Sequence, residues 1–235
     1  MTTEPIDAAA TSTDRIGVCD SESLTDLVQD VAERHELYFD SLLEVGCGGR
    51  PLDSWFSRYS RTECPARYVA VDIDPKVLNK LQANRVMAFP ALKLPFDATS
   101  DLVVAANVIE CIKPDRAERF LQDCAAATGR MFAMSTVNAE GWGRTGVSRD
   151  FRGLSWVPES IIQCYRDGED PNRVRHLLSA GVIDQLFGKV FPASDWIVDI
   201  RRTGAVDISD VARDQSWRLY SKVLAVAVRR SACRG

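Results

Sequence analysis

The sequence lacks long apolar runs and paired cysteines, and it has only two histidines. Because no apolar stretch approaches the ~20 residues that cross a bilayer, a membrane-spanning helix is not expected. The polar, acidic start, MTTEPIDAAATSTD, lacks the apolar core of a secretory signal. The seven cysteines are scattered, with no CxxC pair and no metal-type cluster. These absences predict reduced thiols in a cytoplasmic protein that has neither a metal nor a membrane partner.

The totals fit one ordinary domain that is not a dedicated nucleic-acid binder. The chain has 235 residues, of which 46% are apolar and 26% charged, enough for a single buried core. Its net charge of −4 argues against a surface-wide nucleic-acid footprint, although a local basic patch stays open. We therefore expect a small-molecule partner, with nucleic acid disfavoured, and a monomer or a homodimer.

Apolar strands alternate with amphipathic helices over most of the chain. Short apolar runs predict strands at residues 41–46, 66–73, 85–91, 101–109, 129–136, 195–204 and 221–230. Helical patterns begin near Ser21, Pro51, Pro75 and Lys113. Strands and helices that alternate on short connections predict an α/β fold, with a mostly parallel sheet and helices on both faces.

The alternation breaks after Thr136. Residues 137–156 hold four glycines, three arginines and three aromatics, which predicts a long loop or lid. Helical stretches are expected near 157–167 and 171–188. We divide the chain into a flexible tail at 1–20, one domain at 21–230 with a lid and substrate insertion at about 137–190, and a tail at 231–235.

A glycine turn, LEVGCGG at residues 43–49, follows the first of these strands. It suits a plain tight turn, a dinucleotide site or an S-adenosylmethionine site. The dinucleotide site fits poorly, because the third glycine of GxGxxG is missing and the Glu44 carboxylate would repel a pyrophosphate. S-adenosylmethionine carries an ammonium, a sulfonium and no phosphate, so this carboxylate favours it. Asp72, which ends the next strand, suits the two ribose hydroxyls.

Four blocks of the sequence resemble the class I S-adenosylmethionine-dependent methyltransferases in order and spacing. They are LLEVGCGG, YVAVDIDPKVL, LKLPFDATSDLVVAANVIECI and the C-terminal strand pair, over roughly residues 40–230. The resemblance implies a single-domain Rossmann-like fold, whose seven-stranded, mostly parallel sheet includes an antiparallel C-terminal strand. It also implies S-adenosylmethionine as the cofactor, S-adenosylhomocysteine as the product, and no metal.

The resemblance further implies a cofactor site at the ends of the predicted strands. The methionyl end would meet the glycine turn, Asp72 the ribose, and residues after the third strand the adenine. The implied cofactor residues are Glu44, Gly46, Cys47, Gly48, Asp72, Ile73, Ala91, Leu92, Asn107 and Val108. The last two would face the sulfonium and the acceptor.

Three positions depart from the family pattern. Arg50 takes the place of the third glycine of the common GxGxG turn, which would reshape the loop. Pro90 stands where an acid commonly meets the adenine amine, so adenine recognition would rely on backbone atoms or on Asp97. Cys111 replaces the histidine that many relatives carry after Ile109-Glu110, which weakens the expectation of a histidine base.

Methyl transfer is an in-line displacement that needs alignment and, for a hydroxyl or protonated amine, a general base. The candidate catalytic residues are Glu110, His35 and Glu140, with Asp150 as a further acid. His35 is preferred to His176, because the N-terminal helix of such enzymes often closes over the cofactor. Glu110 fits a pocket floor, although an acid favoured by a helix dipole is the slightly preferred interpretation.

Candidate substrate contacts lie on the first helix and in the lid. They are Tyr38, Trp142, Arg144 and Arg149. Tyr38 would meet the sulfonium side by a cation–π contact, or else pack in the core. The lid arginines and aromatics would grip an acidic or planar substrate, or else form a solvated loop with anchoring tryptophans.

Together these patterns predict an enzyme that methylates an oxygen or nitrogen of a small molecule, such as a metabolite or natural product. An RNA or protein methyltransferase is one alternative, and a concentrated positive face from the lid arginines would favour RNA. A non-catalytic relative that acts through a partner is another, and an occluded acceptor pocket would favour it. A nicotinamide-dependent enzyme is disfavoured by Glu44 and the missing glycine.

Overall fold

The computed structural model describes most strands of the domain and the helices that cover them. The described residues are 17–19, 24–47, 67–72, 76, 79, 87–90, 99–138, 161–164, 175–203, 206–207, 219–220 and 222–233.

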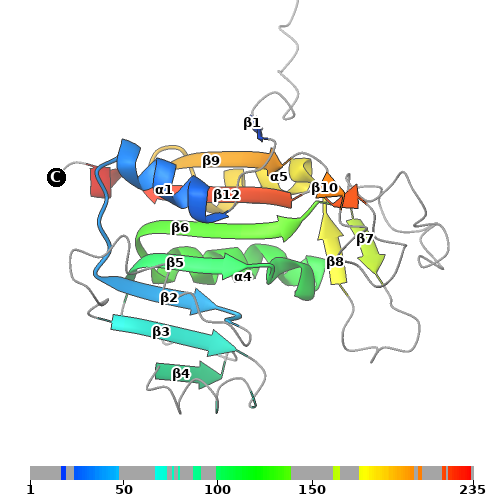
Figure 1. Ribbon diagram of the computed structural model, residues 1–235, viewed down its shortest axis with the longest axis horizontal. Helices are drawn as coiled ribbons and strands as arrows, with labels where there is room; N and C mark the ends of the chain where they lie inside the picture. Colours follow the sequence, from blue (N-terminus) through cyan, green and yellow to red (C-terminus); the bar gives the residue numbers. More distant parts are fainter. Residues whose placement is uncertain are drawn as a thin grey trace, which may run out of the picture.

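One sheet organises these residues (Figure 1), and its strand order is β1-β9-β12-β6-β5-β2-β3-β4. Its strands are β1 (Gly17–Cys19), β2 (Ser41–Val45), β3 (Arg67–Asp72), β4 (Met87–Pro90), β5 (Ser100–Ala106), β6 (Thr128–Val137), β9 (Trp196–Thr203) and β12 (Lys222–Arg229). Neighbours pair in parallel except β12, which is antiparallel to both β6 and β9. The predicted α/β fold with an antiparallel C-terminal strand is therefore confirmed.

The sheet differs from the prediction at one edge, where β1 makes eight strands of the expected seven. Gly17 pairs with Arg201 and Cys19 with Thr203. The three residues of β1, Gly17–Cys19, fall in the segment 1–20 that was predicted to be a flexible tail. The rest of that segment lies outside the described residues. Pairing of this kind satisfies backbone groups along the edge of β9, and a strand of three residues is shorter than the apolar runs that predict strands elsewhere in the chain.

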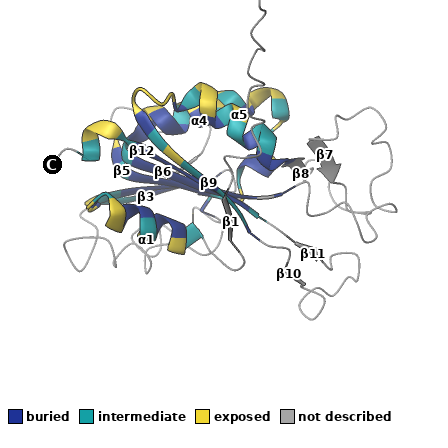
Figure 2. Cartoon of the chain, turned by 90° about the horizontal axis from the view of Figure 1, so that it is seen from above, coloured by how far each residue is buried: buried dark blue, intermediate teal, exposed yellow. Residues whose placement is uncertain are grey.

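Helices cover both faces of the sheet (Figure 2), as predicted. α1 (Leu24–Arg34) lies on one face, and α4 (Pro114–Ala127) and α5 (Ala180–Val190) lie on the other. α4 begins with Pro114, whose missing N–H costs nothing in the first turn. α5 begins after Ser179, whose Oγ accepts the Val182 N–H at 3.3 Å.

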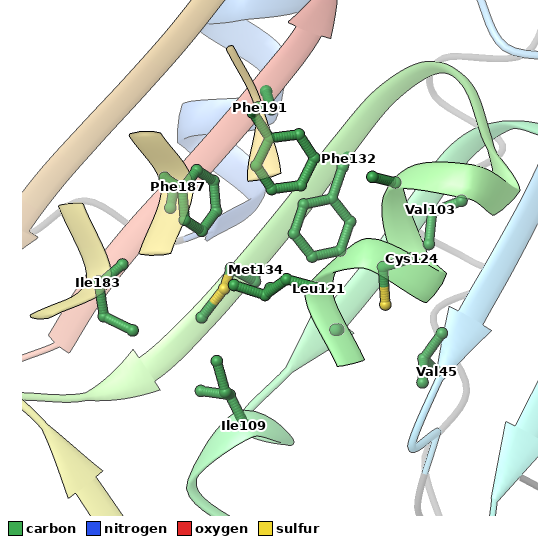
Figure 3. Packing of buried hydrophobic residues seen from close by; sticks show 14 of the residues in the cluster. Val45, Val103, Ile109, Leu121, Cys124, Phe132, Met134, Ile183, Phe187 and Phe191 are labelled. Carbon is green, nitrogen blue, oxygen red and sulfur yellow. The ribbon is translucent and has the colours of Figure 1, made fainter. Parts of the chain in front are cut away.

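Alternate residues of the strands feed two apolar layers. Phe132 and Met134 of β6 pack under α4 and α5, whereas Met131 and Ala133 pack on the α1 side. In the first layer (Figure 3) the rings of Phe132 and Phe191 stack with centroids 5.4 Å apart. β12 serves both layers, because its residues from Val223 to Val228 are 0% exposed.

Two short antiparallel ladders form separate two-stranded sheets. β7 (Ile161–Cys164) pairs with β8 (Arg175–Leu178), and β10 (Val206–Asp207) pairs with β11 (Leu219–Tyr220). The helices expected near 157–167 and 171–188 are therefore wrong where β7 and β8 lie, and a helix begins only at Ala180. Cross-strand pairing overrode the local helical pattern.

The C-terminal end is also more ordered than predicted. Residues Arg230–Cys233 form a short 3-10 helix, η7, where a tail was expected from residue 231. The Cys233 thiol lies 3.6 Å from the Arg229 carbonyl oxygen, and the Arg230 N–H donates to Asp195 O at 2.9 Å. Among the described residues, no helix is both long and apolar enough to cross a membrane.

Candidate active site

The carboxyl ends of β2, β3, β5 and β6 lie at the same end of their strands' common axis, along one side of the sheet. These strands are parallel neighbours, and Figure 1 shows them pointing the same way, toward the end of the molecule where β7, β8 and β10 gather. In open parallel sheets, ligands bind outside the carboxyl ends of the strands. The turns that leave these strands therefore form the candidate site.

The glycine turn after β2 is held against two neighbouring segments. The Gly46 N–H donates to Val71 O at 2.7 Å, and the Cys47 N–H donates to the same oxygen at 3.3 Å. Gly46 has a φ of +67°, which side chains rarely adopt. A Cβ at Gly46 would also lie 2.5 Å from Val108 Cγ2. Both the backbone conformation and the close approach of Val108 require glycine here.

Two buried carboxylates lie beside this turn. Glu44 on β2 is 4% exposed, and Asp72 at the end of β3 is 8% exposed. Leu42 belongs to the α1 layer and Val71 to the opposite one, so strand alternation puts both acids on the α1 face of the sheet. On the same face the Tyr68 hydroxyl donates to Glu44 Oε2. The site is thus strongly acidic.

The Cys47 thiol completes this cluster. Its Sγ lies 3.9 Å from Asp72 Oδ2. Burial, and then the negative charges of Glu44 and Asp72, raise the pKa of Cys47 to about 12. The thiol therefore keeps its proton at neutral pH and faces Asp72 as a weak donor.

The turn after β5 forms the other wall of the site. Asn107 has a φ of 55°, a conformation that a non-glycine residue adopts at some energetic cost and often at functional sites. Its N–H donates to Ser135 O on β6 at 2.8 Å. Val108, next along, meets the glycine turn, and the 3-10 helix η2 (Ile109–Cys111) follows.

Within η2, Glu110 is completely buried. The Thr136 hydroxyl of β6 donates to Glu110 Oε2 at 2.7 Å. Glu110 is thus buried in the turn after β5 and hydrogen-bonded to the neighbouring strand β6.

The structure brings together seven of the predicted site residues. They are Glu44, Gly46, Cys47, Asp72, Asn107, Val108 and Glu110. Outside the described residues lie Gly48, Ile73, Ala91, Leu92, Glu140, Trp142, Arg144, Arg149 and Asp150. Pro90 pairs with Asp72 at the end of β4, which is the position expected from the sequence.

Two predicted residues, His35 and Tyr38, lie at the opposite end of the strands, beside the amino end of β2. Both precede β2, and the Tyr38 carbonyl accepts a hydrogen bond at 3.3 Å from Arg130, near the start of β6. β2 is five residues long and so separates them from Gly46 by ~13 Å or more. The prediction that the first helix brings these side chains to the cofactor is wrong, because α1 returns the chain to the amino end of β2.

Sequence reasoning missed several partners of the site. Tyr68 was detectable, because in RYVAVD it alternates with Asp72 on one face of the strand. Thr136 and the buried Asn138 were not singled out, although one lies near the end of the apolar strand β6 and the other directly follows it. Asn138 forms a parallel bridge with Leu178 of β8, which also packs against η2. The backbone of β8, which includes His176, therefore lies at the site end of the sheet.

The acidic donor set favours an organic cation with hydroxyl groups over a phosphate. Among the residues that the structure describes, no group of three or more His, Cys, Asp and Glu is placed to hold a metal ion. Two buried acids beside a glycine turn favour a ligand with positive charge and hydroxyls, and would repel a pyrophosphate.

Comparison with known proteins agrees with this geometry. Residues 43–129 match the family described as "Methyltransferase domain". Among curated proteins there is no significant match. A solved S-adenosylmethionine-dependent methyltransferase from Clostridium acetobutylicum superposes with a TM-score of 0.53 at 11% identity, covering 87% of this chain and 90% of that one.

Two further solved structures have similar folds. The 1,6-didemethyltoxoflavin-N1-methyltransferase of Burkholderia thailandensis gives a TM-score of 0.54 at 14% identity, covering 89% of this chain and 79% of that one. The plantazolicin methyltransferase BpumL gives 0.56 at 11% identity, covering 88% and 83%. Both of these structures contain S-adenosylhomocysteine. At such identities the likeness shows a shared fold.

The fold, with its glycine turn at the head of a mostly parallel sheet, is the Rossmann-like fold of these methyltransferases. Residues 43–129 match the methyltransferase domain family, and solved S-adenosylmethionine-dependent methyltransferases share the fold of the chain, which supports an enzyme of the methyltransferase type.

Proposed function

We propose that this enzyme transfers the methyl group of S-adenosylmethionine to an oxygen or nitrogen of a small-molecule acceptor. The observation that carries the proposal is the pair of buried carboxylates, Glu44 and Asp72, beside the close-packed Gly46 turn. The cofactor's ammonium and sulfonium are attracted by such acids, and its diol can donate to one of them. NAD would bring a pyrophosphate to the same place and be repelled.

Each residue of the site has a distinct task in this proposal. When bound, S-adenosylmethionine supplies a methyl group already activated on its sulfonium. Asp72 accepts hydrogen bonds from the ribose hydroxyls, and Cys47 faces that carboxylate from the glycine turn. Glu44 adds negative charge on the methionyl side, oriented by Tyr68. Asn107 and Val108 line the side from which the acceptor approaches, so the chain contributes mainly alignment.

A small-molecule acceptor is supported by charge and by the neighbouring enzymes. The net charge of −4 does not favour a polyanionic acceptor. The neighbours include enzymes named for didemethyltoxoflavin, plantazolicin and magnesium protoporphyrin IX. The ladders β7–β8 and β10–β11 belong to segments inserted after β6 and β9, where substrate-specific loops on a rigid scaffold are expected.

The decisive experiment is calorimetric titration with S-adenosylhomocysteine, with NAD as the control ligand. We expect S-adenosylhomocysteine to bind and NAD not to bind. Asp72→Asn should weaken S-adenosylhomocysteine by roughly 10- to 100-fold, because bonds to a charged group are worth about 1.5–3 kcal/mol. NAD binding would overturn the proposal. A folded protein that binds neither ligand would favour the non-catalytic alternative instead.

A further inference from the structure

Glu110 is a buried acid whose place in the site is defined by one neighbouring strand. Its side chain is 0% exposed, as is that of Thr136, whose hydroxyl donates to Glu110 Oε2 at 2.7 Å. Burying a carboxylate is costly unless hydrogen bonds compensate. The Thr136 bond therefore favours one position of η2 relative to the end of β6.

The same turn is fixed to β6 at a second, adjacent point. The Asn107 N–H donates to Ser135 O at 2.8 Å, and Ser135 directly precedes Thr136. Within the turn, the Cys111 N–H donates to Val108 O at 2.8 Å. Val108 thus lies between two anchors, one before it at Asn107 and one after it at Glu110.

Val108 in turn meets the glycine turn. Its Cγ2 occupies the space that a Cβ of Gly46 would need, at 2.5 Å. η2 also packs against β8, the strand that joins the main sheet through the Asn138–Leu178 bridge. The turn that Glu110 anchors therefore touches the cofactor side and the inserted ladder together.

We propose that Glu110 is a positioning residue for the cofactor site. Through the Thr136 hydroxyl it holds the turn of residues 107–111 on β6, which sets Val108 against Gly46 and gives the glycine turn its shape. Complete burial suits Glu110 to this positioning role, whereas the catalytic role expected from the sequence requires contact with the acceptor. The inference rests on the proposed function only in taking S-adenosylhomocysteine as the ligand.

The test compares two buried threonine hydroxyls on the same strand. Thr136→Val removes the donor to Glu110 and keeps the side-chain volume. Thr128→Val is the matched control: Thr128 is also 0% exposed and donates at 2.7 Å, to Cys124 O, but at the other end of β6. For each variant we would measure the dissociation constant for S-adenosylhomocysteine by calorimetry and the melting temperature.

Both variants should lower the melting temperature, but only Thr136→Val should weaken S-adenosylhomocysteine binding. About 5- to 10-fold is expected, the size of one lost hydrogen bond. Thr136→Ser, which keeps the hydroxyl, should restore affinity. Glu110→Gln keeps an oxygen that can accept the hydroxyl, so it should weaken binding less than Glu110→Ala does.

Two outcomes would overturn the inference while leaving the proposed function intact. One is that Thr136→Val binds S-adenosylhomocysteine as tightly as Thr128→Val, which would make the Glu110 bond purely stabilising. The other is that Thr136→Ser fails to restore affinity, which would show that the loss of the hydroxyl did not cause the weaker S-adenosylhomocysteine binding. A folded wild-type protein that does not bind S-adenosylhomocysteine would overturn the proposed function itself, and this inference with it.

Discussion

At the scale of single residues, Gly46 carries the strictest requirement in the site. Its φ of +67° costs an L-residue about 1–2 kcal/mol, and a Cβ would lie 2.5 Å from Val108 Cγ2. We therefore expect Gly46→Ala to lower the free energy of unfolding by at least about 1–2 kcal/mol and to weaken S-adenosylhomocysteine binding. Denaturant unfolding and calorimetry measure the two effects.

Gly188 provides the control for this prediction. It lies in α5, where a Cβ would meet no atom of the described residues within 4 Å. Gly188→Ala should therefore raise stability by about 1 kcal/mol through helix propensity alone. Binding should not change. If Gly46→Ala bound S-adenosylhomocysteine like the wild type, the close approach of Val108 to the glycine turn would not be needed for ligand binding.

The cysteines offer a second test at this scale. Cys47 is buried with a pKa raised to about 12 by burial and by its acidic neighbours, whereas Cys111 is exposed. Since the thiolate is the reactive form, iodoacetamide at pH 8 should modify Cys111 well before Cys47. Peptide mass spectrometry measures the order of modification. Equal rates at the two cysteines would contradict the buried, protonated thiol beside Asp72.

At the scale of elements, charged side chains tie α1 to β9. Arg201 Nη2 lies 2.6 Å from Asp30 Oδ2 and 2.9 Å from Asp199 Oδ2, and Arg34 contacts the same two acids at 2.9 and 2.8 Å. The hydrogen bond from Arg201 lowers the pKa of Asp30 below its ordinary value. Burial alone would raise the pKa of Asp199, but the two arginines together lower it.

These lowered pKa values predict how stability depends on pH. A carboxyl with a depressed folded-state pKa contributes stability above its unfolded pKa, about 3.9, and loses it as the pH falls through the folded value. Asp199→Asn should therefore cost about 1 kcal/mol at pH 7, a modest figure because the pairs are partly exposed. The gap between variant and wild type should shrink below about pH 4.

Urea unfolding at pH 7 and pH 3 checks this prediction. Asp123→Asn is the control, because Asp123 pairs with Arg119 only within α4, at 3.0 Å and with Arg119 77% exposed. It should change stability by less than about 0.5 kcal/mol at either pH. A gap for Asp199→Asn that stayed constant between the two pH values would rule out a contribution from its charge.

The elements also show what the sequence could and could not supply. β2, β5 and β12 were predictable because each is an apolar run long enough to be a buried strand. β8 was not, since Arg175–Leu178 forms a strand by pairing with β7 and has a helical pattern on its own. The prediction for His35 and Tyr38 failed for a similar reason, because a helical pattern does not say at which end of the neighbouring strands the helix ends.

The candidate site also has a part that the sequence predicts and a part that it does not. Gly46 and Asp72 were predictable, because turn chemistry and a strand-ending acid are local signals. The bonds of Tyr68 to Glu44 and of Thr136 to Glu110 join different elements. Such contacts depend on strand register and on how η2 packs, and no local pattern encodes either.

At the scale of the whole molecule, acidity bears on the alternative acceptor. With a net charge of −4 the chain should bind a fluorescent single-stranded RNA oligonucleotide weakly or not at all in about 0.1 M salt. Fluorescence anisotropy measures this directly. Binding that weakened steeply as salt was raised would instead indicate a local basic surface and favour an RNA acceptor.

The antiparallel strand β12 has a consequence for biosynthesis. It lies between β6 and β9, and its residues 223–228 are completely buried, yet it is the last strand of the sheet to leave the ribosome. Until Lys222–Arg229 emerges, β9 and α5 have no central strand to join. A nascent chain can therefore assemble β2, β3, β5 and β6 early, while the half of the sheet that contains β9 must wait until β12 has emerged.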